Sequence, residues 1–275
     1  MKTSNSIAFG LDVLDIRVEI ASDCSLIIYV DAEKAGVANA NELIRQLTKN
    51  VVDEPPFWLR EYIPSYNTLL LEFDLDSTDH IAVKLYCNEL IKRVTASNKT
   101  DACDVILNQN IRLSACPRKT NMHRIPVCYE LSSLDSDLSK VAMSKNLTED
   151  IIVKLHCSVR YRVYATGFLP GFAYLGELPL ELSQPRLDSP RLKVPAGAVA
   201  IADQQTAIYP LESPGGWHIL GFTPISLLSD ELGIEPLLRA GDSVEFYPIT
   251  KAAYFGWPTP HCKKISLQSA GDLTS

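Results

Sequence analysis

The spacing of proline and glycine divides this chain into two stretches that follow different folding rules. From residue 159 onward, short β-prone pieces such as residues 159–165 and 198–202 are separated by segments that contain Pro or Gly. Proline fixes the backbone and withholds a hydrogen-bond donor, whereas glycine permits sharp turns. The pattern therefore predicts short strands joined by rigid turns, as in a small closed β-barrel or sandwich.

The first hundred residues instead show the order strand, strand, helix, twice in succession. Asn39 provides a cap signal for the first helix and Pro55 follows its end, while Val83 and Val94 lie on one apolar face of the second helix. The expected strands are residues 14–20, 24–30, 58–63 and 66–73, and the first helix is residues 40–51. This order predicts a small α+β layer in which helices cover one face of a sheet.

A domain boundary is expected near residue 100. Residues 96–120 mix polar residues and turn formers, which is typical of a connecting region. We therefore expect an α+β domain at residues 1–100 and a mainly-β domain at residues 101–275. The second domain should begin with a strand near residues 125–129, followed by helices at 136–143 and 148–156, the latter capped by Thr148.

Composition limits the classes of function. The net charge of -7 and pI near 5.3 argue against a nucleic-acid or anionic-membrane surface. The longest apolar runs fall far short of the roughly 20 residues that span a bilayer, and the N-terminus lacks the pattern of a secretion signal. Seven cysteines without a Cys-x-x-Cys pair favour a reducing cytoplasm and no metal site.

The most informative motifs lie between residues 167 and 217. They are Gly167-Phe-Leu-Pro-Gly-Phe-Ala-Tyr-Leu-Gly176, Pro185-Arg186, Pro190-Arg191, Val194-Pro-Ala-Gly197, Gln205-Thr206, Ile208-Tyr-Pro210 and Ser213-Pro-Gly-Gly-Trp217. Two further matches are Pro64-Ser-Tyr66, with Leu70-Leu-Glu-Phe-Asp74, and Ile125-Pro-Val-Cys-Tyr129. Together these motifs resemble the family that comprises kinase inhibitor KipI, the B subunit of 5-oxoprolinase and allophanate hydrolase subunit 1.

The resemblance implies a fold, a reaction and partners. It implies that the second domain is a cyclophilin-like barrel and that the chain works as part of a heteromer. For the 5-oxoprolinase branch it implies an ATP-dependent hydrolase that opens 5-oxo-L-proline to L-glutamate, with a larger C-type subunit and an A-type subunit. The KipI branch inhibits a sensor histidine kinase, and a third branch acts on allophanate. Nothing in the sequence resembles a Walker A loop, so ATP is expected at a partner subunit.

Three positions depart from the family pattern. Asp203 and Ala207 stand where relatives typically have glycine, and Phe222 stands where an arginine commonly precedes Thr-Pro. A changed backbone is expected at the first two positions, because only glycine adopts positive φ without strain. At position 222 this chain lacks a guanidinium that could hold a carboxylate or phosphate.

The candidate site lies in this Pro, Gly and aromatic segment. His156, which matches a family histidine and ends a predicted helix, and Gln205 are the candidate catalytic residues. The candidate substrate-binding or partner-binding residues are Phe168, Pro170, Gly171, Tyr174, Arg186, Arg191, Pro195, Thr206, Tyr209, Ser213, Pro214, Gly215, Gly216 and Trp217. Rigid turns and aromatic rings are typical of a concave apolar cleft for a small molecule.

Each of these residues also has a structural interpretation. Aromatic rings and glycines also occur in barrel cores and corners, and Arg186 and Arg191 could form surface ion pairs instead of binding a carboxylate. A histidine at a helix end is often a cap or a core residue. Trp217 and Tyr174 are the aromatic residues for which the pattern favours the site, because Trp217 follows a run of turn formers.

Overall fold

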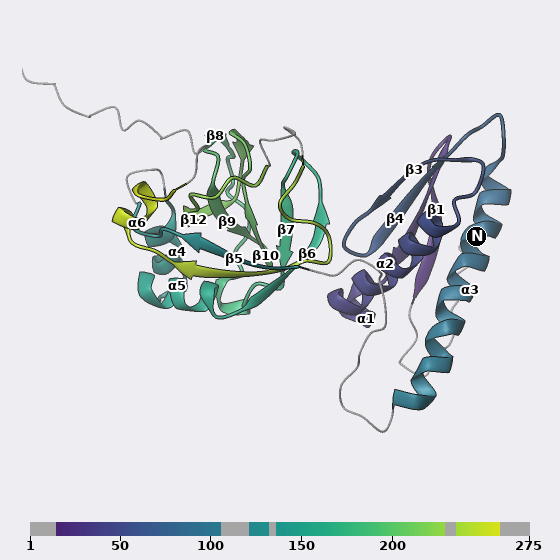
Figure 1. Cartoon of the computed structure of the whole chain (residues 1–275), viewed down its shortest axis with the longest axis horizontal. Helices are drawn as coiled ribbons and strands as arrows, with labels where there is room; N and C mark the ends of the chain where they lie inside the picture. The colour runs from purple at the N-terminus through teal and green to yellow at the C-terminus, as the bar shows by residue number, and fades with distance from the viewer. Residues whose placement is uncertain (1–14, 106–120, 132–135, 229–234, 259–275) are drawn as a thin grey trace, which may run out of the picture. The chain divides into compact units, whose positions relative to one another are not determined.

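The computed structural model describes residues 15–105, 121–131, 136–228 and 235–258 (Figure 1). The chain divides into two compact units, Met1–Lys119 and Thr120–Ser275. Among the described residues, no helix is both long and apolar enough to cross a membrane.

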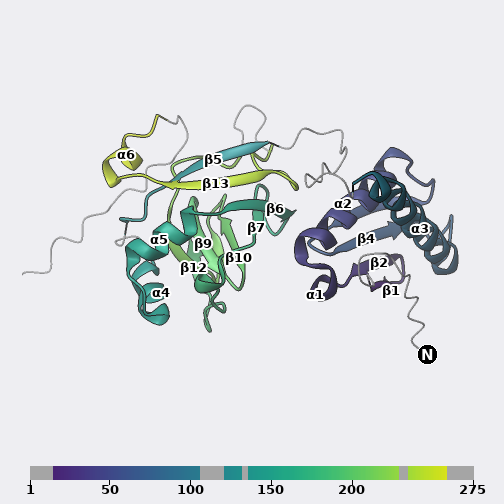
Figure 2. The same ribbon diagram turned by 90° about the horizontal axis from the view of Figure 1, so that it is seen from below.

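The first unit is a four-stranded antiparallel sheet in the order β1-β2-β4-β3. Its elements are β1 (Ile16–Ser22), β2 (Ser25–Val30), α1 (Ala32–Ala35), α2 (Val37–Asp53), β3 (Leu59–Pro64), β4 (Thr68–Phe73) and α3 (His80–Val105). Alternate residues of β4 are buried, including Leu69 and Leu71, and they pack with buried residues of α2 and α3 in one apolar core. Both helices cover the same face of the sheet (Figure 2).

Helix α3 is longer than the sequence indicated. It continues to Val105, whereas residues 96–105 were expected to belong to the connection between the domains. This stretch contains neither Pro nor Gly, so nothing breaks the helix once it has formed, even where its apolar periodicity ends. The two compact units divide after Lys119, which lies within the connection expected at residues 96–120. Residues 106–120 of the expected connection lie outside the described residues.

The second unit is built on a seven-stranded sheet in the order β12-β9-β10-β7-β6-β13-β5. Its strands are β5 (Met122–Val127), β6 (Arg160–Thr166), β7 (Ala173–Gly176), β8 (Arg191–Val194), β9 (Ala198–Ala202), β10 (Gln205–Ile208), β11 (Ser213–Gly215), β12 (His218–Phe222) and β13 (Ser243–Pro248). Its helices are α4 (Leu138–Lys145), α5 (Glu149–Cys157), the 3-10 turn η2 (Leu180–Leu182) and α6 (Lys251–Phe255).

A short bridge brings the two ends of this sheet together. Cys128, directly after β5, exchanges two backbone hydrogen bonds with Phe222 of β12, at N···O distances of 2.8 and 3.0 Å. The sheet is therefore nearly closed, which confirms the barrel expected from the sequence. Strands β8 and β11 form a separate two-stranded ribbon.

The capping prediction for α5 is also confirmed. The Thr148 side chain accepts a hydrogen bond from the Ile151 amide, and Glu149 and Asp150 occupy the first turn. Strands β7, β8 and β11 were missed as strands, because each has only three or four residues and lies among Pro and Gly. Pairing with neighbouring strands, rather than local propensity, defines them.

Candidate functional site

The aromatic residues of the motif segment gather around Phe172, at the start of β7. The ring centroid of Phe172 lies 5.4 Å from Phe168, 4.8 Å from Tyr174, 5.4 Å from Tyr209 and 6.1 Å from Trp217. Phe172, Tyr209 and Trp217 are buried, Tyr174 is half-buried and Phe168 is exposed. The sequence correctly grouped these rings, but most of them pack against one another as core instead of lining an open cleft.

The turn between β6 and β7 holds the exposed end of this aromatic cluster. Phe168 has φ of 75° and Gly171 has φ of 79°, and the Phe172 amide donates to the Leu169 carbonyl at 3.0 Å. Positive φ is uncommon for a bulky residue, so the turn constrains Phe168 where its ring is 62% exposed. Pro170, also in this turn, is exposed.

Arg186 lies over the aromatic cluster. Its guanidinium carbon is 5.9 Å from the Trp217 ring centre, and its Nε is 3.8 Å from the Asp203 carboxylate. Both partners of this ion pair are well exposed, so the pair itself contributes little. Burial raises the pKa of Tyr209 to about 12, and the charge of Arg186 opposes this shift. Arg186 thus places a positive charge beside an otherwise apolar group of aromatic rings.

Arg191 is engaged in a different way from that expected. Its guanidinium donates to both carboxylate oxygens of Asp137, at 2.6 and 2.7 Å, and Asp137 is completely buried. Asp137 also accepts from the Ile219 amide at 2.9 Å. The pair joins β8 and β12 to the start of α4. Arg191 therefore has a structural role, and its guanidinium group is already occupied by Asp137.

His156 is a core residue, which agrees with the structural interpretation of a histidine at a helix end. The side chain is fully buried, and burial lowers its pKa to about 3. The Thr206 hydroxyl donates to the Ala200 carbonyl, so it accepts from His156 Nε2 at 3.0 Å. Nδ1 then accepts from the Tyr129 hydroxyl at 2.7 Å. The imidazole is therefore neutral and fully hydrogen-bonded inside the barrel.

Gln205 and Thr206 point to opposite faces of the barrel wall, because they are neighbours on β10. Thr206 meets His156 in the interior, so the half-buried Gln205 cannot share a site with that histidine. The two candidate catalytic residues are not brought together.

The remaining candidate residues form turns and the β8–β11 ribbon. Pro195 is half-buried before β9, and Pro214 is exposed on β11. Gly215 packs against Tyr209, and Gly216 is half-buried. Ser213 is buried, and its hydroxyl has no hydrogen-bond partner among the described residues.

The three departures from the family pattern have clear locations. Asp203 has φ of 51°, so it adopts the left-handed conformation that a glycine would take freely at this turn. Ala207 is buried on β10. Phe222 is fully buried next to the barrel seam and packs in the same apolar cluster as Phe172 and Trp217. An apolar ring thus fills the position where an arginine was expected.

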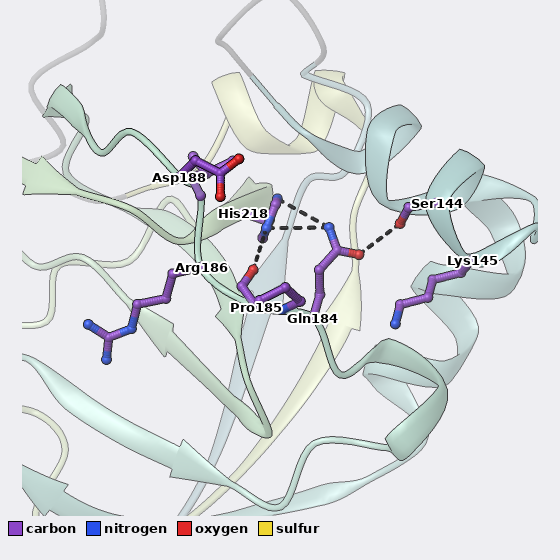
Figure 3. Close-up of a pocket in the computed structure, with 8 residues that line it drawn as sticks. Ser144, Lys145, Gln184, Pro185, Arg186, Asp188 and His218 are labelled. Carbon is purple, nitrogen blue, oxygen red and sulfur yellow. Dashed lines mark hydrogen bonds between the residues drawn. The ribbon is translucent and has the colours of Figure 1, made fainter.

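A pocket of about 430 Å³ lies beside these residues and was missed from the sequence, apart from Arg186 (Figure 3). It is lined by Ser144, Lys145, Gln184, Pro185, Arg186, Leu187, Asp188 and His218. These residues come from the end of α4, the loop before β8 and the start of β12. The one local signal was His218, an imidazole in a strand whose other residues are apolar or glycine.

The comparisons with known proteins agree with this arrangement. The model of the carboxyltransferase domain, subdomain C and D, matches residues 16–234. The chain belongs to this family. Over 211 residues it is 32% identical to the B subunit of 5-oxoprolinase from Bacillus subtilis, a match that covers 75% of this chain and 82% of the relative. Over 124 residues it is 49% identical to the B subunit of 5-oxoprolinase from Escherichia coli O157:H7, a match that covers 45% of this chain and 56% of that relative.

Two solved structures share the fold. A crystal structure of TTHA0988 superposes with a TM-score of 0.62 at 31% identity, covering 82% of this chain and 39% of that one. The Kluyveromyces lactis urea amidolyase superposes with a TM-score of 0.69 at 18% identity, covering 88% of this chain and 15% of that one. Both solved chains are much longer, so this family's fold occurs as one part of larger proteins.

Proposed function

We propose that this chain is a subunit of an ATP-dependent 5-oxoprolinase that opens 5-oxo-L-proline to L-glutamate. In this proposal it acts in the cytoplasm with a larger C-type subunit and an A-type subunit, and its barrel is of the cyclophilin-like kind. The observation that carries the proposal is the 32% identity to the B subunit from Bacillus subtilis across 82% of that protein. A match of this extent includes both units of the chain rather than a single motif.

The proposal divides the chemistry between subunits. Opening an unstrained lactam requires activation of its carbonyl oxygen, for which ATP supplies a phosphoryl group. The sequence has no Walker A loop to cradle phosphates, so we place the nucleotide at a partner subunit. The described residues also contain no group of three or more His, Cys, Asp or Glu side chains arranged to hold a metal ion.

The contribution of this chain would be to hold the small molecule. Arg186 lines the pocket and is suited to the carboxylate of 5-oxo-L-proline. The adjoining aromatic cluster supports Arg186 through Trp217 and keeps one side of the site apolar. In this proposal His156 takes no part in the chemistry, because its side chain is fully buried and both ring nitrogens are hydrogen-bonded inside the barrel.

Growth on the substrate tests this proposal in the organism that encodes the chain. A strain from which the gene is deleted should fail to grow with 5-oxo-L-proline as its sole nitrogen source, and a copy of the gene should restore growth. Growth on L-glutamate should be unaffected in both strains. Undiminished growth of the deletion strain on 5-oxo-L-proline would contradict the proposal.

A further inference from the structure

The polar floor of the pocket described above consists of Ser144, Gln184 and His218, whose side chains contact one another through hydrogen bonds. His218 Nε2 lies 2.8 Å from the Pro185 carbonyl oxygen, which can only accept, so Nε2 carries the proton. The Gln184 amide nitrogen lies 3.4 Å from Nδ1 and 3.3 Å from Nε2 of this ring, and its oxygen accepts from the Ser144 hydroxyl at 2.8 Å. The dashed lines in Figure 3 follow this chain from Ser144 to Pro185.

Two opposite charges line this floor without neutralising each other. Lys145, at the end of α4, donates to the Ser183 carbonyl, which holds its ammonium group at the pocket. Asp188 stands on the loop before β8 and is exposed. Within the described part of the chain, neither Lys145 nor Asp188 forms an ion pair. Such a pair of charges complements a ligand that itself carries both signs.

Arg186 adds a second cation to the lining. Its contacts are the exposed ion pair with Asp203 and the Trp217 ring, and Figure 3 shows its side chain extending away from Gln184 and Lys145. The acidic and basic side chains of the lining are then Lys145, Arg186 and Asp188, two positive charges and one negative charge. A molecule with two carboxylates and one ammonium group carries the complementary charges.

We propose that the pocket binds an acidic α-amino acid as its zwitterion. One carboxylate contacts Lys145, the ammonium group contacts Asp188, and the second carboxylate faces Arg186. The choice of L-glutamate among such amino acids rests on the proposed function, of which it is the product. The pocket then distinguishes product from substrate, because the nitrogen of 5-oxo-L-proline is an uncharged lactam amide and leaves Asp188 without a cation.

Calorimetric titration of the full chain, without partner subunits, tests this assignment. The probes are L-glutamate, glutarate, which has the same two carboxylates but no ammonium group, and 5-oxo-L-proline. We expect L-glutamate to bind up to about fivefold more tightly than glutarate, since an ion pair near the surface contributes up to about 1 kcal/mol. Asp188→Asn should abolish this preference. Glu181→Gln is the matched control, because Glu181 is exposed on η2 and does not line the pocket.

The outcomes are unambiguous. Equal affinity for L-glutamate and glutarate, no binding at millimolar concentration, or an unchanged preference in Asp188→Asn overturns the assignment. Thermal melting of both variants checks that they remain folded. Because the titration needs no partner and no ATP, it can fail while the assembled complex still forms L-glutamate, and it can succeed where the complex has no such activity. The two proposals are therefore tested separately.

Discussion

At the scale of single residues, the buried His156 makes the stability of the barrel depend on pH. Its folded pKa of about 3 lies below the ordinary value of 6.5, so the unfolded chain binds a proton that the folded chain does not. Stability is therefore complete above pH 6.5 and is lost as the pH falls toward 3. We expect the free energy of unfolding to drop by about 2 kcal/mol between pH 7 and pH 5 from this residue alone.

Urea unfolding of His156→Gln at the two pH values measures this contribution. The variant should be less stable at pH 7 but should show a smaller loss between pH 7 and pH 5 than the unmodified chain. His80→Gln, which removes an imidazole from the other unit, is the matched control. An identical pH dependence in His156→Gln and the unmodified chain would show that His156 does not couple folding to protons.

Trp217 gives a second prediction at this scale. Its side chain is 5% exposed and packs against Phe172 and Tyr174, so Trp217→Ala should lower the free energy of unfolding by about 3–5 kcal/mol. Phe168→Ala is the control, because this ring belongs to the same cluster but is 62% exposed, and its removal should cost less than about 1 kcal/mol. Equal losses in the two variants, measured by urea unfolding, would contradict the packing described for Trp217.

At the scale of elements, the barrel depends on the close approach of β12 to the segment after β5. A Cβ atom at Gly221 would lie 2.6 Å from the Cys128 carbonyl oxygen, which is backbone and cannot rotate away. We expect Gly221→Ala to lower the melting temperature clearly, with a loss of about 1–3 kcal/mol or more. Gly216→Ala is the control, because its nearest neighbours would be 3.6 Å away. A Gly221→Ala protein that melts with the unmodified chain would argue against this seam.

The same elements show what the sequence can and cannot reveal. The hairpin of β1 and β2, the cap at Thr148 and the start of α5 depend on local spacing, and they were predicted well. Strands β8 and β11 depend on pairing with each other, which local propensity does not encode. The end of α3 was missed because polar residues without Pro or Gly are compatible with both a helix and a connection.

The same distinction between local spacing and distant contacts applies to the candidate site. Phe172, Tyr174 and Trp217 were found because they lie within one motif segment, but their burial results from contacts between distant strands. Lys145 and His218 share a pocket only because α4 and β12 meet in the fold, so no spacing in the sequence joins them. Arg191 resembled a ligand-binding residue until its buried partner Asp137 was located.

At the scale of the whole molecule, the chain resembles one part of larger proteins. Family membership covers residues 16–234, and each of the two long solved chains includes this fold as a minor part of its length. The sequence lacks a nucleotide-binding loop, and the described residues form a pocket with charges suited to a small carboxylate. We therefore expect this chain alone to bind small molecules and the assembled complex to turn them over.

Reconstitution from purified subunits measures this expectation most directly. The chain is combined with the C-type and A-type subunits that the proposal assigns to it, and L-glutamate formed from 5-oxo-L-proline is measured together with ATP hydrolysis. We expect ATP-dependent L-glutamate formation in the complete mixture and no formation above background when this chain is omitted. L-glutamate formation at the same rate without this chain would contradict its assignment as a required subunit.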